Sequence, residues 1–336
     1  MIRLLNIYFF VLLGFLFCKS LSAQIVSVDG IPRDTSFTVH SAFIKERKVR
    51  PYIEIVKPSL PKGVFAKENI DYRTLAPDRV LHLNVYRPDD TKLYPALLMV
   101  HGGGWGSGSL SLQVPMAQQI ATKGFVAIPV EYRLSPEALY PAALHDLKAA
   151  VRWVKANASE YNIDTTRIAI SGCSAGGQLA MLVGMTNSLP EYEDRSEYAD
   201  YSSSVHAVVN IDGISDFLSD ELEASRVSLS KNKIPSAVKW FGGTFEDKQE
   251  AWINASPIYH ITEKSAPVCF INSSIPRFHA GRDAAIEKLS KYKIYTAVYS
   301  IDDTPHTFWL FHPWFTITVD YMTDFLNNVL EVKKCK

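Results

Sequence analysis

The chain has 336 residues, of which 47% are hydrophobic and 21% charged, and its 35 basic and 35 acidic residues give a formal net charge of zero. A disordered chain would have fewer apolar residues and a large net charge, so the composition indicates a globular protein with a sizeable core. The balanced charge also argues against binding to nucleic acid, because a phosphate backbone attracts strongly basic surfaces.

The first 23 residues have the pattern of an export signal. Arg3 precedes an uncharged apolar run from Leu4 to Cys18, and small residues follow up to Ala23. We expect a signal peptide over residues 1–23 and a secreted or periplasmic protein that keeps no membrane attachment, since the apolar run is shorter than the roughly 20 residues that span a bilayer. A lipid anchor on Cys18 is disfavoured because the bulky Phe17 precedes it.

The four cysteines of the chain do not form a disulfide scaffold. Cleavage would leave Cys173, Cys269 and Cys335, which allow at most one bridge, so we expect buried or tail thiols. No pair of histidine and cysteine has the spacing of a metal site, and we expect neither a metal nor a cofactor.

After an amino-terminal extension (24–62) that we expect to pack on the core, residues 63–334 alternate between strands and helices. The predicted strands are short apolar runs at residues 80–86, 96–100, 125–128, 168–170, 207–211, 268–271 and 295–299. The first alternates apolar and polar residues, as an edge strand does, whereas continuously apolar runs are typical of central parallel strands.

Leu144, Leu147, Val151 and Val154 recur at helical spacing between two of these strands. The alternation predicts a doubly wound, mostly parallel α/β sheet, and residues 218–261 interrupt it in the manner of a cap.

A Gly-x-Ser-x-Gly motif follows the predicted strand at 168–170 and precedes a helix. Its residues are Gly172, Cys173, Ser174, Ala175 and Gly176. A strand, this motif and a helix form a nucleophile elbow, in which a strained turn exposes the central serine and the helix amides point toward negative charge that develops during attack. Cys173 is not at the central position, so we interpret it as a small packing residue.

A second glycine motif, His101-Gly102-Gly103-Gly104-Trp105, ends the strand at 96–100. A loop without side chains lets backbone amides approach the oxyanion of a tetrahedral intermediate. We therefore predict an oxyanion hole made by the amides of Gly103, Gly104 and Ala175.

Together these motifs resemble the α/β-hydrolase esterases, and more narrowly the branch of hormone-sensitive-lipase-like carboxylesterases and bacterial feruloyl and acetyl-xylan esterases. The resemblance covers residues 66–330 and rests on the segments 101–105, 131–135, 146–153, 172–177, 240–243 and 255–257. It implies an α/β-hydrolase fold, with residues 218–261 as a cap after the sixth strand.

The general base of such an enzyme is a histidine after the last strand. Among the nine histidines, His306 fits, just beyond the strand at 295–299, and it would carry the proton of Ser174 to the leaving alcohol. His312 follows closely, but we expect it in the closing helix.

The acid of the triad departs from the family pattern. Relatives carry an aspartate shortly after the strand that corresponds to residues 268–271, but no acid appears here before Asp283. The preceding strand instead ends at Asp212, where relatives have an aromatic or apolar residue. We therefore favour a relocated acid at Asp212, keep Asp283 as the second candidate, and leave a Ser-His dyad open.

Other polar residues near the predicted site receive structural interpretations. Asp302 and Asp303 are too close to His306 in sequence to orient it, and Asp216 matches a position that the family fills with aspartate. Arg277 and His279 stand where the acid loop is expected, and either contact an anionic or hydroxyl-rich substrate or form a solvated loop.

The aromatic residues after His306 suggest packing first. We expect them in the core of the final helix, with one or two lining an acyl pocket or stacking on sugar rings; they are Phe308, Trp309, Phe311, Trp314 and Phe315.

The motifs and the export signal thus predict an exported serine esterase. Together with export, the resemblance implies that it removes acetyl, methyl or feruloyl groups from plant polysaccharide, its partner being an ester or esterified oligosaccharide. Two alternatives stay open. A prolyl-type peptidase shares the fold, although residues 24–62 are too few for the propeller such enzymes carry. A non-catalytic carbohydrate-binding relative would have lost the acid.

Overall fold

The computed structural model describes residues 25–28, 30–194, 197–223 and 234–331. The expected signal peptide (1–23) and Cys335 lie outside these ranges, so cleavage and export stay predictions. Within the described ranges, no helix has the length and apolar character needed to cross a bilayer.

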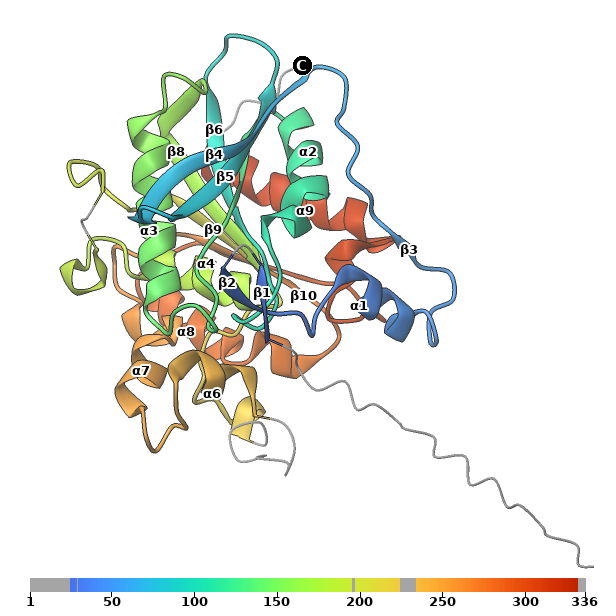
Figure 1. The fold of residues 1–336 in the computed structure, drawn as a ribbon, viewed down its shortest axis with the longest axis vertical. Helices are drawn as coiled ribbons and strands as arrows, with labels where there is room; N and C mark the ends of the chain where they lie inside the picture. Colours follow the sequence, from blue (N-terminus) through green and yellow to red (C-terminus); the bar gives the residue numbers. More distant parts are fainter. Residues whose placement is uncertain (1–24, 29, 195–196, 224–233, 332–336) are drawn as a thin grey trace, which may run out of the picture.

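An eight-stranded sheet forms the centre of the molecule (Figure 1). In chain order its strands are β4 (Val64–Ala76), β5 (Arg79–Pro88), β6 (Tyr94–Val100), β7 (Val126–Val130), β8 (Ile163–Cys173), β9 (Ala207–Ile211), β10 (Val268–Asn272) and β11 (Thr296–Ser300). They lie side by side in the order β11-β10-β9-β8-β6-β7-β5-β4. Within this sheet the strands from β6 onward pair in parallel, whereas β4 and β5 run antiparallel to their neighbours. The predicted doubly wound, mostly parallel sheet is confirmed.

Helices cover both faces of this sheet. One face carries α3 (Ala142–Ala156), α4 (Ala175–Met185) and α8 (Arg282–Lys291), and the other carries α2 (Val114–Thr122) and α9 (Trp314–Val329) (Figure 1). Successive side chains of a strand point to opposite faces. In β6, Leu98 and Val100 therefore pack in the core under α3 and α4, while Leu97 and Met99 pack in the core under α2 and α9.

The prediction that residues 80–86 form an edge strand was wrong. They belong to β5, which is paired with β7 on one side and with β4 on the other. The true edge strand, β4, contains many polar residues and several register shifts. Its sequence therefore shows no clean alternation, because an edge strand exposes much of its surface to water.

Among the described residues, four short elements precede β4. They are the hairpin strands β1 (Ile25–Val28) and β2 (Ile31–Asp34), helix α1 (Val39–Glu46) and strand β3 (Glu54–Ile55). The last of these pairs antiparallel with β12 (Phe311–His312), a two-residue strand near the carboxyl terminus.

The aromatic residues after His306 are buried as expected, but they do not all belong to the final helix. Phe308 and Trp309 lie in the 3₁₀ turn η6 (Phe308–Leu310), and Phe311 and His312 form β12. The expectation for His312 was therefore wrong. A cis peptide bond joins it to Pro313, and α9 begins only after this proline.

Between β9 and β10 the chain forms a group of short helices. These are η3 (Asp220–Leu222), α6 (Ser236–Phe241), α7 (Gln249–Asn254) and η4 (Pro257–His260). Helices α6 and α7 lie together at one end of the sheet (Figure 1). The remaining 3₁₀ turns are η1 (Leu110–Gln113), η2 (Pro190–Tyr192) and η5 (Pro276–His279).

Candidate active site

Ser174 stands in the sharp turn between β8 and α4. Its backbone has φ 56° and ψ −121°. Residues with a side chain rarely adopt this backbone conformation, which costs about 1–3 kcal/mol. The flanking glycines make the turn possible, since a Cβ on Gly172 would lie 2.0 Å from the carbonyl oxygen of Gly176. The turn therefore projects Ser174 from the carboxyl end of the sheet, as the nucleophile-elbow motif predicts.

Ser174, His306 and Asp212 form one hydrogen-bonded chain. The Nε2 atom of His306 lies 2.8 Å from the Ser174 hydroxyl, and its Nδ1 lies 3.0 Å from Oδ2 of Asp212. These residues follow β8, β11 and β9, which are brought to the same edge of the sheet by parallel pairing. The structure thus places the favoured acid, and not Asp283, against the histidine ring.

The carboxylate of Asp212 is completely buried and held from two sides. Oδ1 accepts a hydrogen bond of 2.8 Å from the backbone amide of Ser273, which follows β10. The backbone amide of Asp212 in turn donates to the carbonyl oxygen of Ile271 at 3.0 Å, and its φ of 49° bends the chain out of β9. One oxygen is thereby fixed on the protein backbone, and the other is left for His306.

The ring of His306 is packed between aromatic side chains. Phe278 stacks on it with a centroid distance of 3.3 Å, and Trp309 approaches it edge-on at 5.3 Å. Burial lowers the pKa of His306 below its ordinary value, while the hydrogen bond and charge of Asp212 act in the opposite direction. The imidazole is therefore neutral at neutral pH, which is the form that can accept a proton.

The glycine loop lies on the other side of Ser174. Gly103 and Gly104 have φ angles of 127° and 59°, and a Cβ on Gly103 would lie 2.1 Å from the carbonyl oxygen of Ser107. Ser107 donates to the carbonyl of Gly103 through both its amide (3.0 Å) and its hydroxyl (2.8 Å). The loop is thus a closed, side-chain-free turn beside the serine, and Ala175, the third predicted donor, opens helix α4.

Trp105 connects this loop to the short helices after β9. Its indole stacks on Trp240 at 4.9 Å and packs on Phe217 at 5.4 Å, and its Nε1 donates to Oε1 of Gln178 at 2.8 Å. Gln178 also donates from Nε2 to the carbonyl of Ala255. The insertion after β9 therefore packs against Trp105, the last residue of the glycine motif.

His101 and Tyr132 fix the start of the loop. Their rings stack at 4.5 Å, and the Tyr132 hydroxyl donates to the carbonyl of His101 at 2.9 Å. Burial lowers the pKa of His101 to about 4, so the ring is neutral. A neutral imidazole can donate from Nδ1 to the carbonyl of Gly102, which lies 2.8 Å away. His101 thus serves as an internal brace of the loop.

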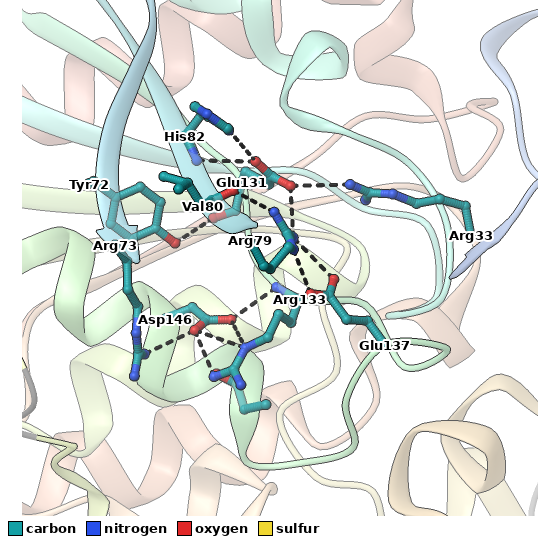
Figure 2. A network of polar contacts seen from close by, with 11 residues as sticks. Arg33, Tyr72, Arg73, Arg79, Val80, His82, Glu131, Arg133, Glu137 and Asp146 are labelled. Atoms are coloured by element: carbon teal, nitrogen blue, oxygen red, sulfur yellow. Dashed lines mark hydrogen bonds and ion pairs between the residues drawn. The ribbon is translucent and has the colours of Figure 1, made fainter. Parts of the chain in front are cut away.

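A network of charged residues holds the segment that carries Tyr132 (Figure 2). Glu131 accepts hydrogen bonds from Arg33 at 3.1 Å and Arg79 at 3.0 Å. The fully buried Asp146 accepts from the amide and guanidinium of Arg133 and from Arg73. These contacts connect β2, the β4–β5 pair, the chain after β7 and helix α3 into one scaffold.

A cavity of about 360 Å³ opens at the Ser174 hydroxyl. Its lining comes from parts of the chain far apart in sequence, namely Ser36, Phe37, Gly102, Gly103, Gly104, Ser107, Leu112, Ser174, Ser236, Phe278, His306, Thr307, Trp309 and Leu310. The cavity therefore has Ser174, His306 and the glycine loop on its walls, together with apolar side chains.

The structure places the other candidate acids away from the histidine ring. Asp283 lies in the first turn of α8, with a side chain that is 82% exposed and forms an ion pair with Arg282. Asp216 accepts from the amide of Leu218 in a local turn. Asp303 is exposed and bonded to Arg50, and the neighbouring Asp302 is exposed as well.

Arg277 and His279 lie in η5, the turn that occupies the position of the expected acid loop. Arg277 is exposed and its guanidinium lies over the ring of Phe278, which itself stacks on His306. Cys173 is buried, and burial raises its pKa to about 12, which fits a packing residue rather than a nucleophile. Cys269 is likewise a buried free thiol.

Several residues of the site had no signal in the sequence. Phe278 and Gln178 do not belong to either glycine motif, and Ser36 and Phe37 lie in the segment before β4 where no motif was found. Only the folded chain brings them to the cavity. Among the described residues, no group of three or more histidine, cysteine, aspartate or glutamate side chains has the arrangement of a metal site.

Comparison with known proteins places this site in a family. The BD-FAE family model matches residues 83–277, which is more than half of the chain. Esterase LipC of Mycobacterium tuberculosis is 33% identical over 198 residues, covering 57% of this chain and 47% of its own. Carboxylesterase NlhH of the same species is 36% identical over 127 residues, covering 37% and 40%. The chain thus spans less than half of the length of these curated relatives.

Solved structures agree with the fold. A structure described as bifunctional GH43-CE of Bacteroides eggerthii superposes with a TM-score of 0.67 at 26% identity, over 78% of this chain and 38% of that one. A truncated carbohydrate esterase from gut microbiota superposes with a TM-score of 0.66 over 82% of this chain and 99% of its own, and its 22% identity shows a shared fold. The chain has the α/β-hydrolase fold and belongs to the BD-FAE family.

Proposed function

We propose that this protein hydrolyses carboxylic esters through a covalent acyl-enzyme. The observation that carries the proposal is the continuous chain of hydrogen bonds from Asp212 through His306 to the Ser174 hydroxyl, at the wall of a cavity that the glycine loop also lines. A buried acid, a neutral imidazole and a serine on a strained elbow are the three parts that activate a serine nucleophile. The curated relatives named as esterases support the same interpretation.

Each residue has a defined role in the proposed reaction. The Ser174 oxygen attacks the ester carbonyl while its proton moves to Nε2 of His306, and Asp212 stabilises the resulting imidazolium. The amides of Gly103, Gly104 and Ala175 hold the oxyanion of the tetrahedral intermediate. His306 then gives the proton to the departing alcohol. A water molecule then attacks the acyl carbon while His306 takes its proton. The bond between that carbon and the Ser174 oxygen breaks, His306 returns the proton to this oxygen, and the carboxylic acid leaves.

The substrate class we propose is small acyl or methyl esters on plant polysaccharide, including acetyl and feruloyl groups. The support comes from the resemblance of the motifs to carbohydrate esterases and from the similarity, at 26% identity, to the structure described as bifunctional GH43-CE of Bacteroides eggerthii. A cavity of about 360 Å³ suits a small group better than a long acyl chain. We also propose export, supported by the pattern of residues 1–23. Export predicts Gln24 as the first residue of the protein recovered outside the cytoplasm.

Hydrolysis of p-nitrophenyl acetate and butyrate tests the reaction, with Ser174→Ala beside the unmutated chain. Ser290→Ala, an exposed serine of α8, is the matched control. We expect loss of turnover by several orders of magnitude in Ser174→Ala only. Release of acetate, methanol or ferulate from esterified xylan and pectin then tests the substrate class.

A chain that hydrolyses neither ester contradicts the proposal. Cleavage of a proline p-nitroanilide would then indicate a peptidase, and retention on xylan without any turnover would indicate a binding protein.

A further inference from the structure

The segment before β4 forms part of the rim of the cavity. Ser36 and Phe37 line it together with the glycine loop, Ser174 and His306. This segment lies outside the part of the chain that the family model matches, so the family does not define its role. Its residues 31–56 contact the site on two sides, next to the glycine loop and next to the loop that carries His306.

On the side of the glycine loop, the segment is held by three contacts. The amide of Asp34 donates to the carbonyl of Gly106 at 3.2 Å, and the carboxylate of Asp34 lies 3.5 Å from the Lys239 ammonium. Arg33 donates to Glu131 at 3.1 Å and thereby joins the charged network that supports the loop (Figure 2). The strand β2 is thus tied to the same scaffold as the predicted oxyanion donors.

On the side of the histidine, the segment is held again. Arg50 donates from Nε to the carbonyl of Asp303 at 3.1 Å and from Nη2 to the carboxylate of Asp303 at 2.9 Å. Strand β3 pairs with β12, and the amide of Val56 donates to the carbonyl of Leu310 at 3.0 Å. The loop that carries His306 is therefore anchored to the same segment.

Between these anchors stands Phe37, the largest side chain that the segment contributes to the cavity. It is half-buried and packs against the apolar cluster that contains Trp309 and Leu310. The chain direction after it is set by Thr38, which caps α1 in a capping box with Ser41. The backbone is thus held on both sides of Phe37, by the amide contact of Asp34 and by the capping box of α1.

We propose that Phe37 is a specificity-determining residue, which limits the size of the group that the cavity accepts beside Ser174. This inference rests on the proposed esterase function and deepens it. A phenyl ring on the wall of a cavity of about 360 Å³ takes up space that a longer chain needs. Each methylene that an apolar pocket accepts or rejects changes discrimination by about tenfold or more, so the loss of the ring has a measurable effect.

The experiment compares Phe37→Ala and the bulkier Phe37→Trp with the unmutated chain and with Ile44→Ala, a control on α1 whose side chain is 46% exposed. One series varies the acyl group of p-nitrophenyl esters from acetate to octanoate, and a second keeps acetate and varies the alcohol. We expect Phe37→Ala to raise kcat/KM for the longer members by roughly tenfold relative to acetate. Phe37→Trp should lower kcat/KM for the longer members relative to acetate, and Ile44→Ala should leave this ratio unchanged.

A second readout does not depend on turnover. The rate at which p-nitrophenyl alkylphosphonates of increasing chain length label Ser174, measured by mass spectrometry, should shift in the same way. Each label forms a bond between the Ser174 oxygen and phosphorus, and p-nitrophenolate leaves.

The outcomes separate this inference from the proposed function. A relaxed preference in either series supports the role of Phe37 and shows which half of the ester lies against it. Unchanged preferences in both Phe37 variants overturn the inference while leaving the esterase in place. An unmutated chain that neither hydrolyses an ester nor takes the label overturns both.

Discussion

Replacing Asp212 by asparagine exchanges one carboxylate oxygen for an NH₂ group in the hydrogen-bonded series Asp212–His306–Ser174, which we propose activates Ser174. In the native protein Oδ1 accepts the Ser273 amide at 2.8 Å and Oδ2 accepts Nδ1 of His306 at 3.0 Å. In the Asp212→Asn variant, the carboxamide oxygen is expected to stay on the buried Ser273 amide, because an unpaired amide there is costly. The NH₂ group of the variant then faces His306 and forces its proton onto Nε2. That nitrogen can no longer accept the proton of Ser174.

The magnitude follows from two losses that act together. The variant holds the wrong tautomer, and it lacks the negative charge that stabilises the imidazolium in the transition state. The same substitution in a Ser-His-Asp triad of another fold costs about 10⁴-fold in kcat, which corresponds to about 5 kcal/mol. Substrate contacts are untouched, so KM should change far less than kcat.

The assay is hydrolysis of p-nitrophenyl acetate by Asp212→Asn and by Asp283→Asn, with urea unfolding as a check that both variants are folded. Asp283 is the matched control, since its carboxylate is exposed and bonded to Arg282. A loss confined to Asp212→Asn supports the reasoning. It is refuted if Asp212→Asn keeps activity within about tenfold of the unmutated chain, or if Asp283→Asn loses as much.

Two further predictions concern protonation and stability. Burial lowers the pKa of His306, and a general base works in its neutral form. The value of kcat/KM for p-nitrophenyl acetate should therefore rise with pH around a midpoint below the ordinary histidine value of 6.5. A midpoint above 6.5 would contradict the lowered pKa. The Asp146→Asn variant removes the buried negative charge that Arg73 and Arg133 share, so the free energy of unfolding in urea should fall by about 3 kcal/mol, although Arg73 keeps its pairs with Asp194 and Glu197. Glu160→Gln, which breaks an exposed pair with Lys67, should leave it unchanged; equal effects would count against the buried network.

The residues that hold the glycine loop and the loop with His306 in place come from regions far from Ser174. The glycine loop contacts Trp105, which packs against the insertion after β9, and Tyr132, which hydrogen-bonds to His101. The neighbours of Tyr132, Glu131 and Arg133, belong to the charged network (Figure 2). The loop with His306 depends on the segment before β4. The proposed catalytic parts are therefore braced by several regions, and the segment before β4 contacts both the scaffold of the glycine loop and the loop with His306. Strained turns such as the one at Ser174 persist where the surrounding structure over-determines them.

Local patterns in the sequence were enough for the other strands of the sheet, the elbow and the glycine loop, but they did not predict β4. A Gly-x-Ser-x-Gly motif between an apolar run and a helix specifies its turn through neighbours only a few residues away, since Gly172 and Gly176 leave room that no other residue would. His306 was identified because the last strand of the sheet leads directly into its loop. Where the pattern was weak, as in the polar edge strand β4, the assignment of the neighbouring β5 was wrong.

The choice of acid is a different kind of problem. Asp212 and Asp283 were both candidates in sequence, and the decision depended on distances across the sheet. Parallel pairing of β9 with β10 sets the end of β9 beside Ser273 and within hydrogen-bond reach of the His306 ring. Asp283, at the start of helix α8, is exposed to solvent instead.

The cavity shows the same division. The sequence by itself determined the fold and the choice of Ser174 and His306 as the proposed nucleophile and base, because these depend on local turns and on the alternation of strands and helices. Only the tertiary structure decided that Phe278 would stack on His306, and that Phe37 would stand more than two hundred residues away in sequence yet share a cavity with Trp309. Such contacts arise from the packing of whole elements against each other, and no local pattern encodes them.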